Sequence, residues 1–233
     1  MKKALVVLSG GMDSTAALYK VQKEFESVEA ISFNYGSKHN DEEHRCAKAT
    51  CEKLDIKWQR VDLPFVNELF KSDLLKSGGD IPEGHYAEPT MQRTVVPFRN
   101  GIMLAIACGY AESVGADFLV LGNHYGDHAV YPDCRADFVN AMADAMRLGT
   151  YAEIELHTPF TEITKTDIAK LGDELGVDWL KTYSCYKGGT IHCGRCSTCY
   201  ERREAFVDAK VYDPTEYLDK TPFEDLRTEY ESK

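Results

Sequence analysis

The chain of 233 residues has no apolar run long enough to cross a bilayer, and the longest such stretches span residues 4–8 and 102–108. The N-terminus has a basic start and a short apolar run but no small-residue cleavage site, so we expect no secretory signal. Basic residues are scarce relative to acidic ones, because the chain has 27 Lys and Arg and 38 Asp and Glu. The net charge of −11 disfavours a general nucleic-acid-binding surface. We therefore expect a cytoplasmic protein without direct nucleic-acid binding.

Internal repeats and low-complexity tracts are also missing, which excludes a repeat array and a disordered chain. Apolar residues make up 43% and charged residues 28%, as in ordinary globular proteins. The length suits one domain, with room for a small appendage. Since the character of the sequence shifts only after about Tyr183, where cysteines gather, we expect a main domain over residues 1–183. Residues 184–233 should form a segment packed on it.

Short apolar runs alternate with helical patterns along the chain. This order predicts an α/β fold with a doubly wound parallel sheet and helices on both faces. Residues 72–94 are rich in glycine, proline and charge, and we expect a long mobile loop that could act as a lid. The expected strands are residues 4–8, 28–33, 57–63, 118–121 and 155–158, and the expected helices are 13–25, 39–54, 100–114, 135–148 and 165–175.

A glycine loop follows the first expected strand and opens the first helix. Two adjacent glycines let backbone N–H groups approach a phosphate, and the helix N-terminus adds its positive dipole. The loop lacks both the lysine of a Walker motif and the spacing G-x-G-x-x-G. An acidic Asp13 beside a phosphate must cap the loop or hold Mg²⁺; alternatively, Asp13 or Ser14 only caps the helix. The predicted phosphate-contacting residues are Leu8, Ser9, Gly10, Gly11, Met12, Asp13 and Ser14.

Half of the eight cysteines lie within fifteen residues, at Cys185, Cys193, Cys196 and Cys199. The short gaps allow all four thiolates to surround one tetrahedral ion, and a shell closed by four sulfurs leaves no position for substrate. We therefore expect structural zinc. An iron–sulfur cluster and a redox cysteine pair are the competing interpretations. His192 is expected at the surface or beside the ligands.

Other candidate site residues follow the expected strands or open helices. Asp133 could accept two hydrogen bonds from a guanine-like ring on which Tyr131 stacks, or it could cap the helix that begins near residue 135. Arg99 could clamp a carboxylate or phosphate, with Asn100 as a helix N-cap. Lys165 could reach a phosphate, although a solvated helix lysine is its simpler interpretation.

The pattern S-G-G-x-D-S resembles the PP-loop of the N-type ATP pyrophosphatases, a Rossmann-like fold in which this loop holds the pyrophosphate of ATP. Together, the motifs resemble the 7-cyano-7-deazaguanine synthase family of queuosine biosynthesis. The resemblance covers nearly the whole chain. It depends on the motifs S-G-G-M-D-S at 9–14, T-V-V-P-F-R-N at 94–100, Y-P-D-C-R at 131–135 and C-x7-C-x2-C-x2-C, and on the single residues Tyr35, Gly36, His39, Glu42, Asp127 and Lys165.

The resemblance implies an ATP-dependent carbon–nitrogen ligase. ATP would adenylate the carboxylate of 7-carboxy-7-deazaguanine, ammonia would displace AMP, and a second adenylation would turn the amide into the nitrile. Mg²⁺ would accompany ATP, one structural zinc would bind per chain, and the enzyme would be a homodimer. The alternatives are a related ligase that stops at the amide or uses another carboxylate, and a nucleotide-binding zinc protein without catalysis. The implied catalytic residues are Asp13, Lys165 and Arg99, and the implied substrate-binding residues are Tyr35, His39, Asn100, Asp127, Tyr131 and Asp133.

Overall fold

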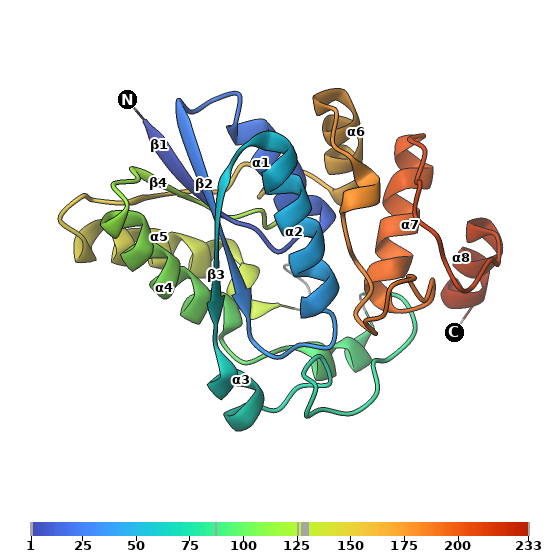
Figure 1. Cartoon of the computed structure of the whole chain (residues 1–233). Helices are drawn as coiled ribbons and strands as arrows, with labels where there is room; N and C mark the ends of the chain where they lie inside the picture. Colours follow the sequence, from blue (N-terminus) through green and yellow to red (C-terminus); the bar gives the residue numbers. More distant parts are fainter. Residues whose placement is uncertain (1, 87, 125, 127–130, 233) are drawn as a thin grey trace.

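The computed structural model describes residues 2–86, 88–124, 126 and 131–232 (Figure 1). Strands alternate with one or more helices as far as β5, and the regular elements after β5 in the described residues are helices joined by irregular segments. The strands are β1 (Lys3–Val7), β2 (Ser27–Asn34), β3 (Lys57–Asp62), β4 (Phe118–Val120) and β5 (Glu155–His157). The α-helices are α1 (Met12–Val21), α2 (Asn40–Leu54), α3 (Pro64–Leu69), α4 (Arg99–Ser113), α5 (Ala136–Gly149), α6 (Lys165–Leu175), α7 (Ser197–Ala209) and α8 (Phe223–Glu231).

The strands form one sheet in the order β3-β2-β1-β4-β5, and each neighbouring pair is parallel. The chain therefore builds the sheet outward from β1 in one direction and then, from β4 on, in the other. In open sheets of this kind ligands bind beyond the carboxyl ends of the strands where the order reverses. The candidate site is thus expected beside the ends of β1 and β4, and the predicted doubly wound fold is confirmed.

Alternate residues of β1 face opposite layers of the molecule. Leu5 packs in a cluster with α4, whereas Ala4 and Val6 pack in a second cluster with α1, α6 and α7. Figure 1 shows α4 and α5 on one side of the sheet and α1, α2 and α6 on the other. A strand covered on both faces needs apolar residues at every position, which explains the continuous apolar run at the N-terminus.

The predicted elements occur with shifts of a few residues at their ends, while α3, α7 and α8 were not expected. Within residues 72–94, a 3-10 helix spans Pro89–Thr94, and Leu74, Leu75 and Met91 are buried. This segment therefore packs against the domain over part of its length; its mobility stays a prediction.

The C-terminal residues share the core of the main domain. Ala205 and Phe206 of α7 pack in the same cluster as α1 and α6, and α8 packs its Leu226 against Tyr200. The expected boundary between residues 183 and 184 therefore falls inside a common core, and the division into a main domain and a C-terminal segment packed on it stays a prediction. None of the helices in the described part of the chain has the length and apolar character needed to span a membrane.

Gly10 is a position that tolerates no side chain. Its φ is +94°, and a Cβ atom would lie 2.1 Å from the carbonyl oxygen of Glu43 in α2. We expect Gly10→Ala to lower the free energy of unfolding by about 3 kcal/mol or more, since backbone strain and a backbone clash add. The control is Gly109→Ala in α4, where a Cβ meets nothing within 4 Å, so a gain of about 0.5–1 kcal/mol is expected. Urea denaturation measures both, and equal stability of the two variants would contradict the prediction.

Candidate functional site

The glycine loop between β1 and α1 is closed by its two serines. Ser14 Oγ lies 2.9 Å from Ser9 Oγ and accepts a hydrogen bond from Ser9 N at 3.1 Å, and Gly11 N donates to Ser9 Oγ at 3.0 Å. Because α1 begins at Met12, its first backbone N–H groups have no partner inside the helix and point toward the end of the sheet. This geometry suits a bound anion.

Distant segments hold this loop in place. Tyr183 N donates a hydrogen bond of 2.9 Å to Gly10 O. Gly122, just after β4, packs so closely on α1 that a Cβ there would lie 3.0 Å from Ser14 Cα. The loop is therefore fixed by both the C-terminal third of the chain and the neighbouring strand.

Lys165 lies between two carboxylates at the N-terminus of α6. Its Nζ is 3.1 Å from Asp13 Oδ2 and 2.6 Å from Glu201 Oε2. His124 Nε2 lies 3.7 Å from Glu201 Oε1 and 4.0 Å from Asp13 Oδ2. The Lys165 side chain is only 13% exposed, so its interpretation as a solvated helix lysine is wrong. Asp13 pairs with this lysine, and α1 has no side-chain cap at its N-cap residue Gly11.

A second group of residues surrounds Arg99 with aromatic rings. The guanidinium carbon is 5.8 Å from the ring centroids of Tyr35 and Tyr131, and Nη1 donates to the Tyr35 hydroxyl at 3.4 Å. The hydroxyls of Tyr131 and Tyr186 are 3.0 Å apart, and Tyr186 stacks on His39 with centroids 5.1 Å apart. We call these five residues the arginine–tyrosine site.

Burial shifts the pKa of His39, which belongs to this site, and the pKa of Glu43, which lies beside it. It lowers the pKa of His39 to about 3, and it raises the pKa of Glu43 to about 8 against the opposing effect of Arg99. His39 Nε2 lies 3.5 Å from Glu43 Oε2. His39 is therefore neutral at pH 7, and Glu43 exchanges its proton near neutral pH.

Asp133 holds the start of α4. Its Oδ2 accepts from Asn100 N at 2.8 Å, while Asn100 Nδ2 donates to Asp133 O at 3.1 Å and to Cys134 Sγ at 3.2 Å. Asp133 therefore caps α4, and the prediction that it caps the following helix α5 is wrong, since the α5 N-cap is Arg135 without a side-chain cap. Asn100 is the second residue of α4, so its prediction as N-cap is also wrong; Phe98 holds that position. Contact of Asp133 with substrate stays a prediction.

One cavity at the carboxyl end of the sheet joins the glycine loop, the Lys165 cluster and the arginine–tyrosine site. Asp133 and Gly10 are not among its lining residues, and Asp127 lies outside the described residues. Sequence reasoning missed Glu43 and Glu201. Only the i, i+4 spacing from His39 hinted at Glu43, and no local signal marked Glu201. The predicted residues that line the cavity are Leu8, Ser9, Gly11, Met12, Asp13, Ser14, Tyr35, His39, Arg99, Asn100, Tyr131 and Lys165.

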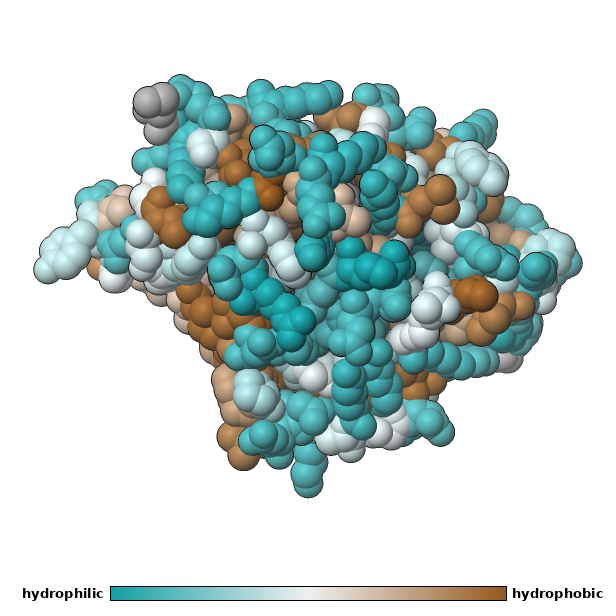
Figure 2. Space-filling view, viewed as in Figure 1, coloured by the Kyte–Doolittle hydropathy of each residue, from teal (hydrophilic) through white to brown (hydrophobic). Residues whose placement is uncertain are grey.

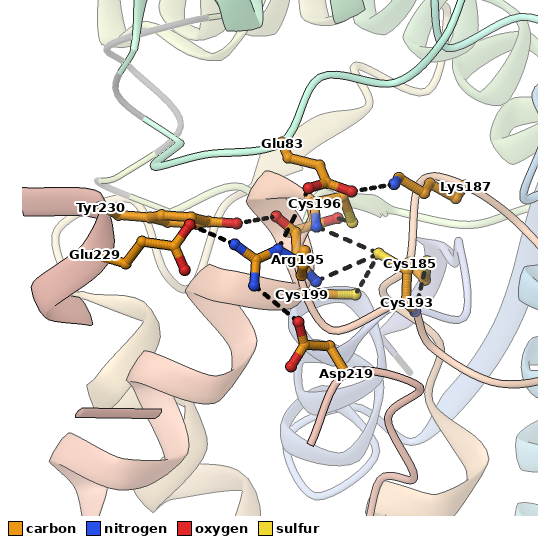
Figure 3. Close-up of polar contacts among 11 residues, drawn as sticks. Glu83, Cys185, Lys187, Cys193, Arg195, Cys196, Cys199, Asp219, Glu229 and Tyr230 are labelled. Atoms are coloured by element: carbon orange, nitrogen blue, oxygen red, sulfur yellow. Dashed lines mark hydrogen bonds and ion pairs between the residues drawn. The ribbon is translucent and has the colours of Figure 1, made fainter. Parts of the chain in front are cut away.

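The four clustered cysteines converge at the start of α7 (Figure 3). Their sulfur atoms all lie within 4.8 Å of one another, and Cys193 Sγ is 3.9 Å from Cys199 Sγ. Backbone N–H groups of Cys193 and Cys196 donate to Cys185 Sγ and Cys193 Sγ, each at 3.3 Å, which favours thiolates. The group can hold a metal ion.

The side chains of Arg195 and His192, which neighbour the clustered cysteines in sequence, bond groups other than the cysteine sulfurs. Figure 3 shows Arg195 reaching Asp219 and Glu229, at 2.8 and 2.5 Å, and Glu83 of the 72–94 segment at 3.3 Å. Arg195 therefore ties three segments together. His192 is 6% exposed and accepts from Ser184 N at 3.0 Å, which excludes the surface position and leaves its other expected place, beside the ligands.

The sheet order, the glycine loop and the conjoined cavity define an α/β protein of the PP-loop ATPase type with a four-cysteine group. A family model described as "Queuosine biosynthesis protein QueC" matches residues 3–210. The chain belongs to this family, as its motifs predicted.

Relatives support the same assignment. The chain is 53% identical over 216 residues to a 7-cyano-7-deazaguanine synthase of Porphyromonas gingivalis, covering 93% of this chain and 97% of that protein. It is also 53% identical to a 7-cyano-7-deazaguanine synthase of Desulfotalea psychrophila, covering 94% and 100%. Among solved structures, NMN synthetase from Francisella tularensis is similar with a TM-score of 0.51 and 14% identity, covering 99% of this chain and 84% of that one. That likeness concerns the fold alone.

Proposed function

We propose that the chain uses ATP to convert 7-carboxy-7-deazaguanine and ammonia into 7-cyano-7-deazaguanine, passing through an adenylated acid and an amide. The observation that carries this proposal is that one cavity contains two kinds of site. One part has the glycine loop and Lys165, and the other has Arg99 with its surrounding tyrosines. The phosphates of ATP need a site for anions, and an aromatic carboxylic acid needs an arginine beside aromatic rings. The two sites must be adjacent for the carboxylate to reach ATP. The names of the curated relatives support the choice of substrate.

In this proposal the nucleotide phosphates lie at the start of α1. Backbone N–H groups of the glycine loop bind the pyrophosphate, together with the hydroxyls of Ser9 and Ser14. Asp13, which reaches the cavity from the first turn of α1, is the residue that would contact Mg²⁺. Lys165 offsets the negative charge that develops on the phosphates as pyrophosphate leaves.

The deazaguanine acid occupies the arginine–tyrosine site. Arg99 pairs with the carboxylate, since its planar guanidinium matches two oxygens. Tyr35 and Tyr131 offer ring faces to the flat heterocycle, and His39 and Asn100 contact its polar edge. Asp133 and Asp127 are further candidates for that edge, and Asp133 already engages one carboxylate oxygen in capping α4.

The reaction needs no covalent intermediate with the protein. The substrate carboxylate attacks the α-phosphorus of ATP, and pyrophosphate leaves. Ammonia then attacks the acyl carbon, and AMP departs with the electron pair of the broken C–O bond. A second adenylation, on the amide oxygen, lets that oxygen leave with AMP as the nitrile forms. Positioning and charge neutralisation supply most of the rate.

We further propose that the metal is zinc, one per chain, held by the four cysteines. Zn–S bonds of about 2.3 Å place the sulfurs of a regular tetrahedron about 3.8 Å apart. The 3.9 Å between Cys193 Sγ and Cys199 Sγ fits this value. A four-iron cluster binds each thiolate at a different iron, which spreads the sulfurs more widely than a single ion does.

We also propose a cytoplasmic homodimer. No disulfide joins any of the eight cysteines, all of which lie in the described part of the chain, and this suits a reducing compartment. Apolar residues gather beside α4 on the face in Figure 2, and Phe98, which precedes α4, is 59% exposed. Such a patch suits contact between two copies. Sedimentation of the purified protein measures the assembly.

Incubation with ATP, Mg²⁺, ammonium and 7-carboxy-7-deazaguanine tests the function. We expect AMP and pyrophosphate in every turnover, and mass spectrometry should find the amide first and the nitrile later. Accumulation of the amide alone would identify a ligase that stops one step earlier. Formation of ADP would contradict adenylation, and binding of ATP without any turnover would contradict the proposed activity.

A further inference from the structure

Glu43 is a carboxyl group in the cavity to which no role has yet been given. It lies in the first turn of α2, and its side chain is 14% exposed. Its backbone packs directly against the glycine loop, since the Glu43 carbonyl oxygen is the atom that a Cβ on Gly10 would meet. Its side chain lines the same cavity as Arg99. Glu43 thus joins the phosphate-binding part of the cavity to the arginine–tyrosine site.

The contacts of Glu43 do not explain a structural role. Within the described part of the chain, the polar contacts of its carboxylate are Asn40 Nδ2 at 3.4 Å and His39 Nε2 at 3.5 Å, both long. Burial of a carboxyl group is unfavourable unless strong partners compensate for lost hydration. By contrast, the preceding residue, Glu42, has a side chain that is 17% exposed and bonds Arg45 Nε at 2.7 Å. A weakly held acid facing a cavity suits proton transfer.

We propose that Glu43 is the catalytic base that takes the proton released by ammonia as it attacks the adenylated substrate. This inference rests on the proposed function. As the new C–N bond forms, the C–O bond to the AMP phosphate breaks and AMP leaves with its electron pair. One N–H proton moves to the Glu43 carboxylate, so that acyl adenylate, ammonia and carboxylate become amide, AMP and carboxylic acid.

The charges around Glu43 change during the reaction in a way that suits this role. Without substrate, burial raises the pKa of Glu43 to about 8 although Arg99 already lowers it, and a substrate carboxylate at Arg99 makes a second anion there still less favourable. Adenylation removes the negative charge of the acid. Arg99 then faces Glu43 alone again, so the pKa of Glu43 returns toward about 8, which suits a base that accepts a proton near neutral pH. Neutral His39 does not compete for the proton, because burial lowers its pKa to about 3.

The test separates the two halves of the reaction in Glu43→Gln. Exchange of labelled pyrophosphate into ATP, with the deazaguanine acid and without ammonium, measures adenylation. We expect it to stay within about 3-fold of wild type, because the base acts only after adenylation. Amide formation with ammonium should fall by about 10²- to 10⁴-fold, the range for loss of a general base. Retained exchange also demonstrates that the variant is folded.

The matched control is Glu52→Gln, which removes an exposed carboxylate from the same helix and should leave both activities unchanged. Equal loss of exchange and amide formation in Glu43→Gln would overturn the inference and make Glu43 a binding residue, and unchanged amide formation would overturn it as well. If Glu43→Gln does not fold, Glu43→Asp replaces it, with the expectation of normal exchange and amide formation at least 10-fold slower; equal effects on the two again overturn the inference. Wild-type protein without exchange would instead refute the proposed function, and this inference with it.

Discussion

Replacing Lys165 by methionine is expected to lower kcat by about 10³-fold. Its ammonium group lies between Asp13 and Glu201, so its removal leaves two carboxylates facing the ATP phosphates. Loss of one preorganised electrostatic group in an active site reduces rates by about 10²- to 10³-fold, and the uncompensated carboxylates add repulsion. The rate of AMP release in a mixture of ATP, Mg²⁺, ammonium and the deazaguanine acid measures the effect.

Lys170→Met provides the control on the same helix. Lys170 is exposed on α6, so its loss should leave AMP release within about 2-fold of wild type, as for surface substitutions with small effects on stability. Lys165→Arg should retain the charge but not the fit between the carboxylates, and an intermediate rate is expected. Normal turnover by Lys165→Met would assign Lys165 to the structural ion pairs of α6 and α7 alone.

Removal of the zinc that we propose at the four cysteines is expected to unfold the C-terminal segment and abolish activity together. Structural zinc contributes about 10–16 kcal/mol in small zinc-binding peptides, whereas a whole domain is stable by only about 5–15 kcal/mol. Cys196 immediately precedes α7, Cys199 lies in its first turn, and Glu201 follows Cys199 by two residues. Loss of the metal should therefore also release the carboxylate that pairs with Lys165.

Cys199→Ser measures this effect, with metal content, thermal unfolding and AMP release recorded on one preparation. Cys108→Ala is the matched control, because its thiol is buried in α4 and is not one of the four clustered sulfurs, and a loss of about 1 kcal/mol or less is expected. Cys199→Ser protein that melts like wild type and still turns over would show that the cysteine group supports neither the fold nor the site.

The sequence predicted the sheet and the glycine turn between β1 and α1 well because both depend on local patterns. The apolar run of β1 and the two glycines after it lie next to each other in the chain. Helices α7 and α8 were missed for a physical reason. Tyr200 and Arg202 of α7 are buried by contacts with distant residues, and Arg202 bonds Trp179 O and Asp213, so its helix has no single apolar face.

The candidate site also contains residues that local sequence patterns indicate and residues that only tertiary packing brings in. Lys165 was found because it opens a helix after the last strand, whereas its partner Glu201 arises only when α6 and α7 pack together. Asp133 illustrates the opposite error. Its position before a helix suggested a local cap, but its carboxylate crosses to Asn100 on α4. No spacing along the chain indicates which of two neighbouring helices a capping side chain will choose.

Asp13, Lys165 and Glu201 lie far apart in the sequence, so they are translated at different times and come together only late in synthesis. Ribosomes add about 5–20 residues each second, so the 188 residues from Asp13 to Glu201 (201 minus 13) separate their appearance by roughly 10–40 s. The phosphate loop is thus translated first and its last carboxylate partner close to the end. Tyr183, whose backbone anchors Gly10, also arrives late. A growing chain therefore carries an incomplete centre, and ATP turnover begins only once the C-terminal helices have emerged and closed over the start of the molecule.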